Sequence, residues 1–183
     1  MTKTDAQFSK AMAVCREMFV AKLADYGPSW RIMRSQSLTD QIFIKAKRIR
    51  SLQTKDHAAV NEGILPEFIG IVNYGIIGII QLELGCSDDK DISNDRAIEL
   101  YDNIAARAVK LMMAKNHDYD EAWRSMRVSS YDDFILVKIQ RIKEIEDNNG
   151  HTEVSEGIDA NYLDIINYAV FGIIKLSIDK DEA

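Results

Sequence analysis

The chain has 183 residues, of which 46% are hydrophobic and 28% charged, and its formal net charge is −6. This composition is typical of a globular protein with a sizeable core, and the negative charge argues against direct binding to a nucleic-acid backbone. Cys15 and Cys86 belong to no Cys-x-x-Cys pair or Cys/His cluster. Their isolation argues against a zinc site and favours a reducing cytoplasm, and the N-terminus lacks the pattern of a signal peptide.

The first half of the chain is expected to form three helices. Two prolines and nine glycines in this length favour long helices over short strands. Gly27-Pro28 ends the first helix, and Pro66 is tolerated in the first turn of the third. A polar connector follows at residues 85–92. Apolar residues recur at helical spacing over residues 5–25, 38–52 and about 62–84.

Residues 64–82 are almost continuously apolar and approach the length that spans a membrane. The segment contains Glu67 and Asn73, is interrupted by three glycines and has no flanking basic clusters. Because polar groups are costly in lipid, we expect a buried core helix and no membrane association.

The pattern of the first half appears again in the second half. The matches lie 93 residues apart, or 94 after one inserted residue, and this density predicts a tandem duplication with repeats at 5–84 and 93–178. The expected fold is one all-α domain, a pseudo-two-fold helical bundle with the third helix of each repeat at its centre. Matching pairs include Lys22/Lys115, Asp25/Asp118, Tyr26/Tyr119, Trp30/Trp123, Lys45/Lys138, Arg48/Arg141, Glu62/Glu156, Asn73/Asn167 and Gly78/Gly172.

Acidic residues gather around the start of the last expected helix. On a helix, Glu156, Asp159, Asp164 and Asn167 fall within an arc of about 140°. Carboxylates at this spacing suit Mg²⁺, which prefers oxygen ligands, water and substrate phosphates. The first repeat has leucine and glycine at the positions of the two aspartates. This asymmetry predicts one site per chain, in the second half, with Glu156, Asp159 and Asp164 as metal ligands.

Two basic pairs complete the expected site. Lys138 and Arg141, like Lys45 and Arg48 in the first repeat, lie three residues apart and share a helix face. Arginine and lysine at this spacing suit the oxygens of a phosphate chain. The alternative is that Lys138 and Arg141 form interhelical salt bridges with the acids of the last helix.

Three further residues are candidate substrate contacts. Tyr119 and Trp123 offer rings on which a base stacks, although a tryptophan at such a corner also serves as a packing residue. Asn167 lies on the face of the predicted metal ligands, where its amide contacts either the substrate or a neighbouring central helix.

These motifs resemble a known family. Lys-x-x-Asp-Tyr…Trp, Lys-x-x-Arg-Ile and Glu-Gly-Ile-x₅-Asp-Ile-x-Asn-Tyr resemble the nucleotide modification associated domain 1 family, whose function is unknown. The duplicated arrangement, over nearly the whole chain, is similar to the stand-alone bacterial form.

Shorter phage members of that family are similar to the all-α nucleoside triphosphate pyrophosphohydrolases of the MazG and dimeric dUTPase type. Those bundles bind Mg²⁺ through acidic residues on two helices. The resemblance implies that Glu156 and Asp164 match the acidic motif of the last helix, with Asp159 as a third ligand. Lys138 and Arg141 stand where those enzymes have a Glu-x-x-Glu pair.

Two functions are left open. The first is Mg²⁺-dependent nucleotide binding or pyrophosphohydrolysis, in which metal-held carboxylates polarise the phosphate chain and position a water. The second is a non-catalytic interaction or accessory module in nucleotide modification, in which the charged pairs are internal salt bridges that fix helix register. The expected partner is a nucleotide, and association into a homo-oligomer is left open.

Overall fold

The computed structural model describes residues 2–54 and 63–179, and all regular structure in these ranges is helical. A short turn, η1 (Ser29–Ile32) or η2 (Ala122–Ser125), follows the first helix of each half, and a π-helical turn, η3 (Ile174–Ile178), continues the last helix. The helices are α1 (Lys3–Tyr26), α2 (Ser35–Thr54), α3 (Leu65–Leu84), α4 (Asn94–Tyr119), α5 (Val128–Asp147) and α6 (Ile158–Ile173).

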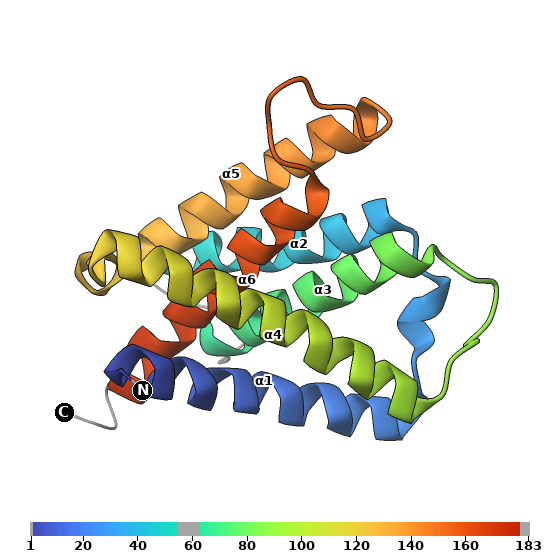
Figure 1. Cartoon of the computed structure of the whole chain (residues 1–183), viewed down its shortest axis with the longest axis horizontal. Helices are drawn as coiled ribbons and strands as arrows, with labels where there is room; N and C mark the ends of the chain where they lie inside the picture. The colour runs from blue at the N-terminus through green and yellow to red at the C-terminus, as the bar shows by residue number, and fades with distance from the viewer. Residues whose placement is uncertain (1, 55–62, 180–183) are drawn as a thin grey trace.

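The helices form three layers around a central crossing (Figure 1). Helices α3 and α6 make the most extensive contact in the bundle and form the middle layer. Helices α2 and α5 pack against each other and against this pair, while α1 and α4 cover its other side. The order α1-η1-α2-α3 recurs as α4-η2-α5-α6. The protein is therefore a pseudo-two-fold bundle built from a duplicated three-helix unit, as the sequence predicted.

Helix α3 is long and apolar enough to cross a membrane by length and composition alone, and 67% of its most apolar window is buried inside the bundle. Its side chains face α6, α2 and the α1/α4 layer. The structure thus gives this segment the role of a core helix.

Glycines bring the two central helices close together. A Cβ atom at Gly78 would lie 2.9 Å from Cζ of Tyr162, and one at Gly172 would lie 3.0 Å from Cε1 of Phe68. The two contacts are related by the duplication, because Gly78 matches Gly172 and Phe68 matches Tyr162 in the repeat register. Each central helix therefore packs an aromatic ring against a glycine of the other, and both rings are fully buried.

The duplication also explains an isolated buried carboxyl group. The Tyr162 hydroxyl is hydrogen-bonded to Thr39 Oγ1 at 2.8 Å, and Thr39 donates to Glu146 at 2.7 Å. In the other half Asp132 replaces Thr39, and Phe68, which has no hydroxyl, replaces Tyr162. Asp132 is fully buried, and neither carboxyl oxygen has a hydrogen-bond partner in the described chain. Burial raises the pKa of Asp132 to about 7.

Replacing Gly78 by alanine tests the central crossing. The added methyl group has to displace the Tyr162 ring, so we expect the free energy of unfolding to fall by about 1–3 kcal/mol. The measurement is urea unfolding, with Gly63→Ala as the control, because no atom of the described residues lies within 4 Å of a Cβ at Gly63. Equal unfolding midpoints for the two variants would show that the helices do not touch there.

Replacing Asp132 by asparagine tests the buried carboxyl. The folded-state pKa lies above the unfolded value, so the contribution of this group is lost as the pH rises from about 4 to about 7. We expect Asp132→Asn to match the wild type at about pH 4 and to be more stable by about 2–4 kcal/mol at about pH 8. Urea unfolding at both pH values measures this difference. The control is Asp133→Asn, which alters the exposed neighbouring residue. Its free energy of unfolding should fall between the two pH values as that of the wild type does.

Candidate functional site

The predicted metal ligands lie in three different surroundings. Asp164 is buried in α6, whereas Asp159, in the first turn of that helix, has a 56% exposed side chain 3.7 Å from Arg107 of α4. Glu156 is exposed in the loop before α6. In residues 2–54 and 63–179, no three Asp, Glu, His or Cys side chains are grouped to hold a metal ion. The described structure therefore does not bring Glu156, Asp159 and Asp164 together: α4 and α5 supply cations to Asp159 and Asp164, and Glu156 lies in the preceding loop.

Asp164 is the centre of a charged triad that joins three helices. Its carboxylate accepts from Lys115 of α4 and lies 2.7 Å from Nζ of Lys138 of α5. Burial lowers the pKa of Lys115, but the hydrogen bond and the charge of Asp164 outweigh it and leave that pKa above its usual value. The salt-bridge alternative is thus confirmed for Lys138. For Arg141, no ion pair with Glu156 is present within the described ranges.

The first half neutralises its basic pair from a different position. Nζ of Lys45 lies 3.4 Å from the Glu67 carboxylate, and Arg48 lies 2.5 Å from the same carboxylate. Glu67 stands one helical turn before Gly70, the residue that matches Asp164. The counter-ion has therefore moved by one turn between the halves. Sequence reasoning missed this role, although a lone glutamate in an apolar helix was a usable signal.

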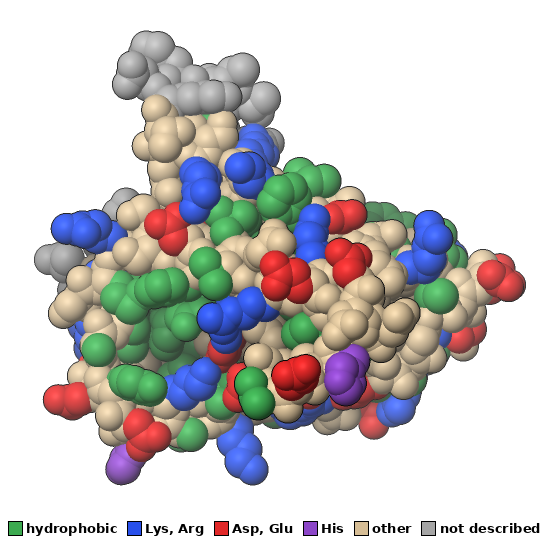
Figure 2. Space-filling view, turned by 90° about the horizontal axis from the view of Figure 1, so that it is seen from above, with side chains coloured by type: hydrophobic (Ala, Val, Ile, Leu, Met, Phe, Trp, Pro, Cys, Tyr) green, Lys and Arg blue, Asp and Glu red, His purple; other side chains and the backbone are tan. Residues whose placement is uncertain are grey.

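A cavity of about 260 Å³, here called the second pocket, opens beside the triad between α4, η2, α5 and α6. It contains several predicted site residues together with rings that were not predicted. Figure 2 shows a face on which exposed hydrophobic side chains line a hollow with Lys and Arg side chains near its edge. The lining residues used below are Lys115, Tyr119, Trp123, Phe134, Asp164, Asn167 and Tyr168.

Trp123 is a packing residue in this pocket. Phe171 stacks on its ring at a centroid distance of 4.4 Å, and the Arg124 guanidinium lies 4.4 Å from the ring centroid. Its indole N–H donates to Oδ1 of Asn116 at 3.2 Å. The stacking surface expected from Trp123 is therefore covered, while Tyr119 is 69% exposed. Tyr119, Phe134 and Tyr168 are the rings that remain open to a ligand.

Among the described residues, neither the amide nitrogen nor the amide oxygen of Asn167 has a hydrogen-bond partner, although both atoms are buried. Its counterpart Asn73 is fully bonded, since it donates to the Cys15 carbonyl at 3.0 Å and accepts from the Tyr101 hydroxyl at 2.8 Å. The same residue type at matching positions is thus structural in the first half and unpaired in the second. A buried polar group without a partner is costly, so Asn167 is the strongest candidate ligand contact.

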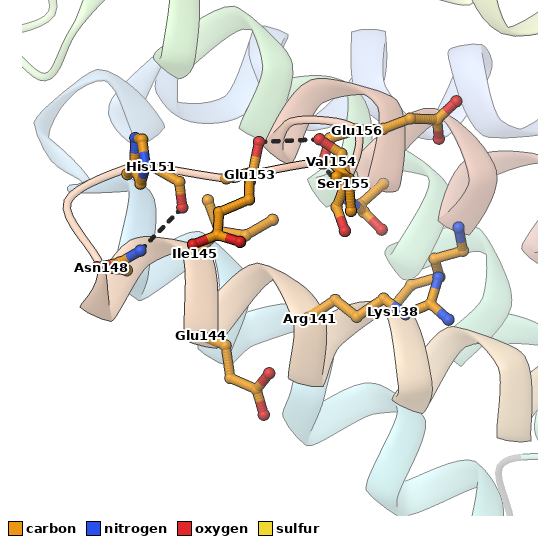
Figure 3. A pocket seen from close by; sticks show the side chains of 12 residues that line it. Lys138, Arg141, Glu144, Ile145, Asn148, His151, Glu153, Val154, Ser155 and Glu156 are labelled. Carbon is orange, nitrogen blue, oxygen red and sulfur yellow. Dashed lines mark hydrogen bonds between the residues drawn. The ribbon is translucent and has the colours of Figure 1, made fainter.

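Another cavity lies beside α5 and the start of α6. It measures about 630 Å³ and lies between the end of α5 and the loop at 148–157. Figure 3 shows Lys138 and Arg141 next to each other on α5, with Glu153 and Glu156 on the loop that faces them. Both acidic and basic side chains line this cavity.

Glu62, the residue that the repeat register pairs with Glu156, lies outside the described residues.

Comparison with known protein families gives one match. The family model described as nucleotide modification associated domain 1 matches residues 22–82 and 115–176, one segment in each half of the bundle. Comparison with curated proteins and with solved structures gives no significant match.

The contrast between the two asparagines generates a stability test. Leucine has nearly the shape of asparagine, so Asn167→Leu removes an unpaired amide and should raise the free energy of unfolding by about 1–3 kcal/mol. Asn73→Leu leaves a hydroxyl and a carbonyl unpaired and should lower it by about the same amount. Chemical denaturation of both variants measures the two changes. A loss of stability in Asn167→Leu as large as that in Asn73→Leu would mean that Asn167 is structurally bonded.

Proposed function

The chain belongs to the nucleotide modification associated domain 1 family, and we propose that it binds a nucleoside or nucleotide through the second pocket. The observation that carries the proposal is the unpaired, buried amide of Asn167 in the wall of that pocket. One planar amide supplies a donor and an acceptor side by side, the arrangement that pairs with the edge of a nucleobase. The open rings of Tyr119, Phe134 and Tyr168 supply stacking surface of the kind that unpaired bases use.

The charged residues next to the pocket suit the phosphate end of such a ligand. The Lys115–Asp164–Lys138 triad has two positive charges and one negative charge. Arg141 lies one turn beyond Lys138 on α5, is exposed and lines the adjoining cavity. A guanidinium and a partly compensated lysine at this point favour oxygens of a phosphate chain. In this proposal the base enters the second pocket and the phosphates extend toward α5.

The surroundings of the acids favour binding without hydrolysis. The Asp164 carboxylate is held by two lysines and the Asp159 carboxylate lies near Arg107. These donors do not fit a shared Mg²⁺ ion, which needs carboxylate oxygens directed at one point. The resemblance to MazG-type and dimeric dUTPase-type pyrophosphohydrolases therefore does not carry over to the metal ligands. An accessory, non-catalytic role in nucleotide modification fits the salt bridges better.

Both cysteines are free thiols, Cys15 buried and Cys86 exposed. Free thiols are usual in a reducing compartment, and this supports the proposal that the protein acts in the cytoplasm.

Binding of nucleosides and nucleotides tests the proposal. Isothermal titration calorimetry with the common ribo- and deoxyribonucleosides and their mono- and triphosphates should find at least one ligand. Asn167→Leu should lower the affinity for that ligand by about 10- to 100-fold, because a bidentate contact with the base is lost. Asn103→Leu, which alters an exposed asparagine of α4, is the matched control and should bind as the wild type does.

Two results would contradict the proposal. One is the absence of binding by every member of the panel to a folded wild-type protein. The other is unchanged affinity in Asn167→Leu. Because that variant should be at least as stable as the wild type, the weaker binding that we expect would not come from unfolding. A parallel assay for pyrophosphate release from the triphosphates should find none.

A further inference from the structure

The first half of the bundle contains its own cavity, here called the first pocket. It has a volume of about 680 Å³ and lies between α1, η1, α2 and α3. Its wall repeats that of the second pocket position by position, because the duplication relates the two sets of residues. The matched pairs are Lys22/Lys115, Tyr26/Tyr119, Trp30/Trp123, Met33/Met126, Gly70/Asp164, Asn73/Asn167 and Tyr74/Tyr168.

The charge between the paired lysines differs in the two pockets. In the second pocket the Asp164 carboxylate lies between Lys115 and Lys138 and contacts both. In the first pocket the same position is Gly70, which has no side chain. The carboxylate that would join Lys22 to Lys45 is therefore missing from the protein itself.

Among the described residues, Lys22 is the lysine of this pocket that has no carboxylate partner, because Glu67, which also lines the pocket, pairs with Lys45. No carboxylate of the described chain lies within ion-pair distance of Lys22, which is exposed at the pocket wall. Lys45 is 3.4 Å from Glu67, and that carboxylate is shared with the closer Arg48. Positive charge concentrated in a cavity attracts an anion.

A second, independent observation comes from Trp30. Its indole N–H is buried and has no acceptor within the described ranges, and the residue lines the first pocket. In the second half the matching N–H of Trp123 donates to Asn116. The counterpart of Asn116 is Leu23, which has no acceptor on its side chain. The first pocket thus has an unpaired buried donor as well as two lysines, and it lacks the buried aspartate of the second.

We propose that the first pocket is a second ligand site, distinct from the one in the second half, and that it binds a small anion attached to a planar ring. The anionic group contacts Lys22 and the ammonium group of Lys45, whose side chain lies over Gly70. Tyr26 and Tyr74 in the pocket wall contact the ring. The class of molecule with this combination, in a family associated with nucleotide modification, is a nucleoside monophosphate.

The decisive variant transfers the aspartate from one half to the other. In Gly70→Asp the protein supplies its own carboxylate to the two lysines, so an anionic ligand is excluded. A Cβ at Gly70 would lie 2.7 Å from Cε of Lys45. This long side chain is flexible and can turn aside, at the cost of its 3.4 Å contact with Glu67, so the variant should fold. Gly70→Asn fills the same space without the charge and is the matched control.

Calorimetric titration with the four ribonucleoside 5′-monophosphates measures the effect. We expect Gly70→Asp to lower the affinity for the monophosphate at least about tenfold, and Lys22→Gln to lower it by a similar factor. Gly70→Asn should lower the affinity less. Asn167→Leu should leave the shift of the Trp30 indole signal on addition of the monophosphate unchanged, which separates the first pocket from the ligand proposed for the second. Wild-type affinity in Gly70→Asp would overturn the proposal.

Nuclear magnetic resonance locates the ligand independently, because the chain has two tryptophans and so two indole N–H signals. The Trp30 signal should move on addition of the monophosphate. Movement of the Trp123 signal alone would place the ligand in the other half and overturn the proposal. Inorganic phosphate and free nucleosides serve as separate ligands, and both should bind more weakly than the monophosphate. Equal binding of inorganic phosphate would overturn the assignment of a ring-bearing ligand.

Discussion

The close crossing of α3 and α6 is the contact on which the rest of the bundle depends. Two glycines, Gly78 and Gly172, let the rings of Tyr162 and Phe68 lie against the opposite helix. Because a packed core transmits small displacements, this crossing fixes the distance and angle between the two halves. Each pocket is built on the outer face of one of these helices. The positions of Asn73, Asn167 and both lysine pairs follow from that arrangement.

Charge on the buried central helices is the second constraint. Glu67 and Asp164 are each nearly buried, and each is balanced by lysine or arginine from the neighbouring helices. Removing one partner of such a pair leaves an uncompensated charge, which is more costly than the pair itself. The duplication preserved the requirement for one carboxylate per half, but its position moved by one turn. That shift gives one pocket an internal salt-bridge triad and places the Lys45 side chain over Gly70 in the other.

The two halves have thus exchanged their bonded and unbonded polar groups. Within the part of the chain that the structure describes, the asparagine of the first half is bonded and its indole N–H is not. In the second half the indole N–H is bonded and the asparagine is not. Two unrelated unpaired polar groups would not be expected to show this reciprocal pattern at matching positions. It is consistent with two pockets of common origin that have come to bind different parts of a ligand, or different ligands.

The sequence by itself determined the duplication, the helical class and the central place of the third helix in each half, and it offered the pairing of Lys138 with an acid of the last helix as one of two alternatives. These follow from periodicity and from the cost of burying charge, both of which are local or pairwise properties. Only the tertiary structure decided which groups meet. Spacing along α6 fixes only the angle between Asp159 and Asp164, about 140° around the helix. Arg107 and Lys115, which lie next to them, come from α4, some fifty residues earlier. The hydrogen bonding of Asn73 and Asn167 differs for the same reason. These identical residues at matching positions face partner helices whose sequences have diverged.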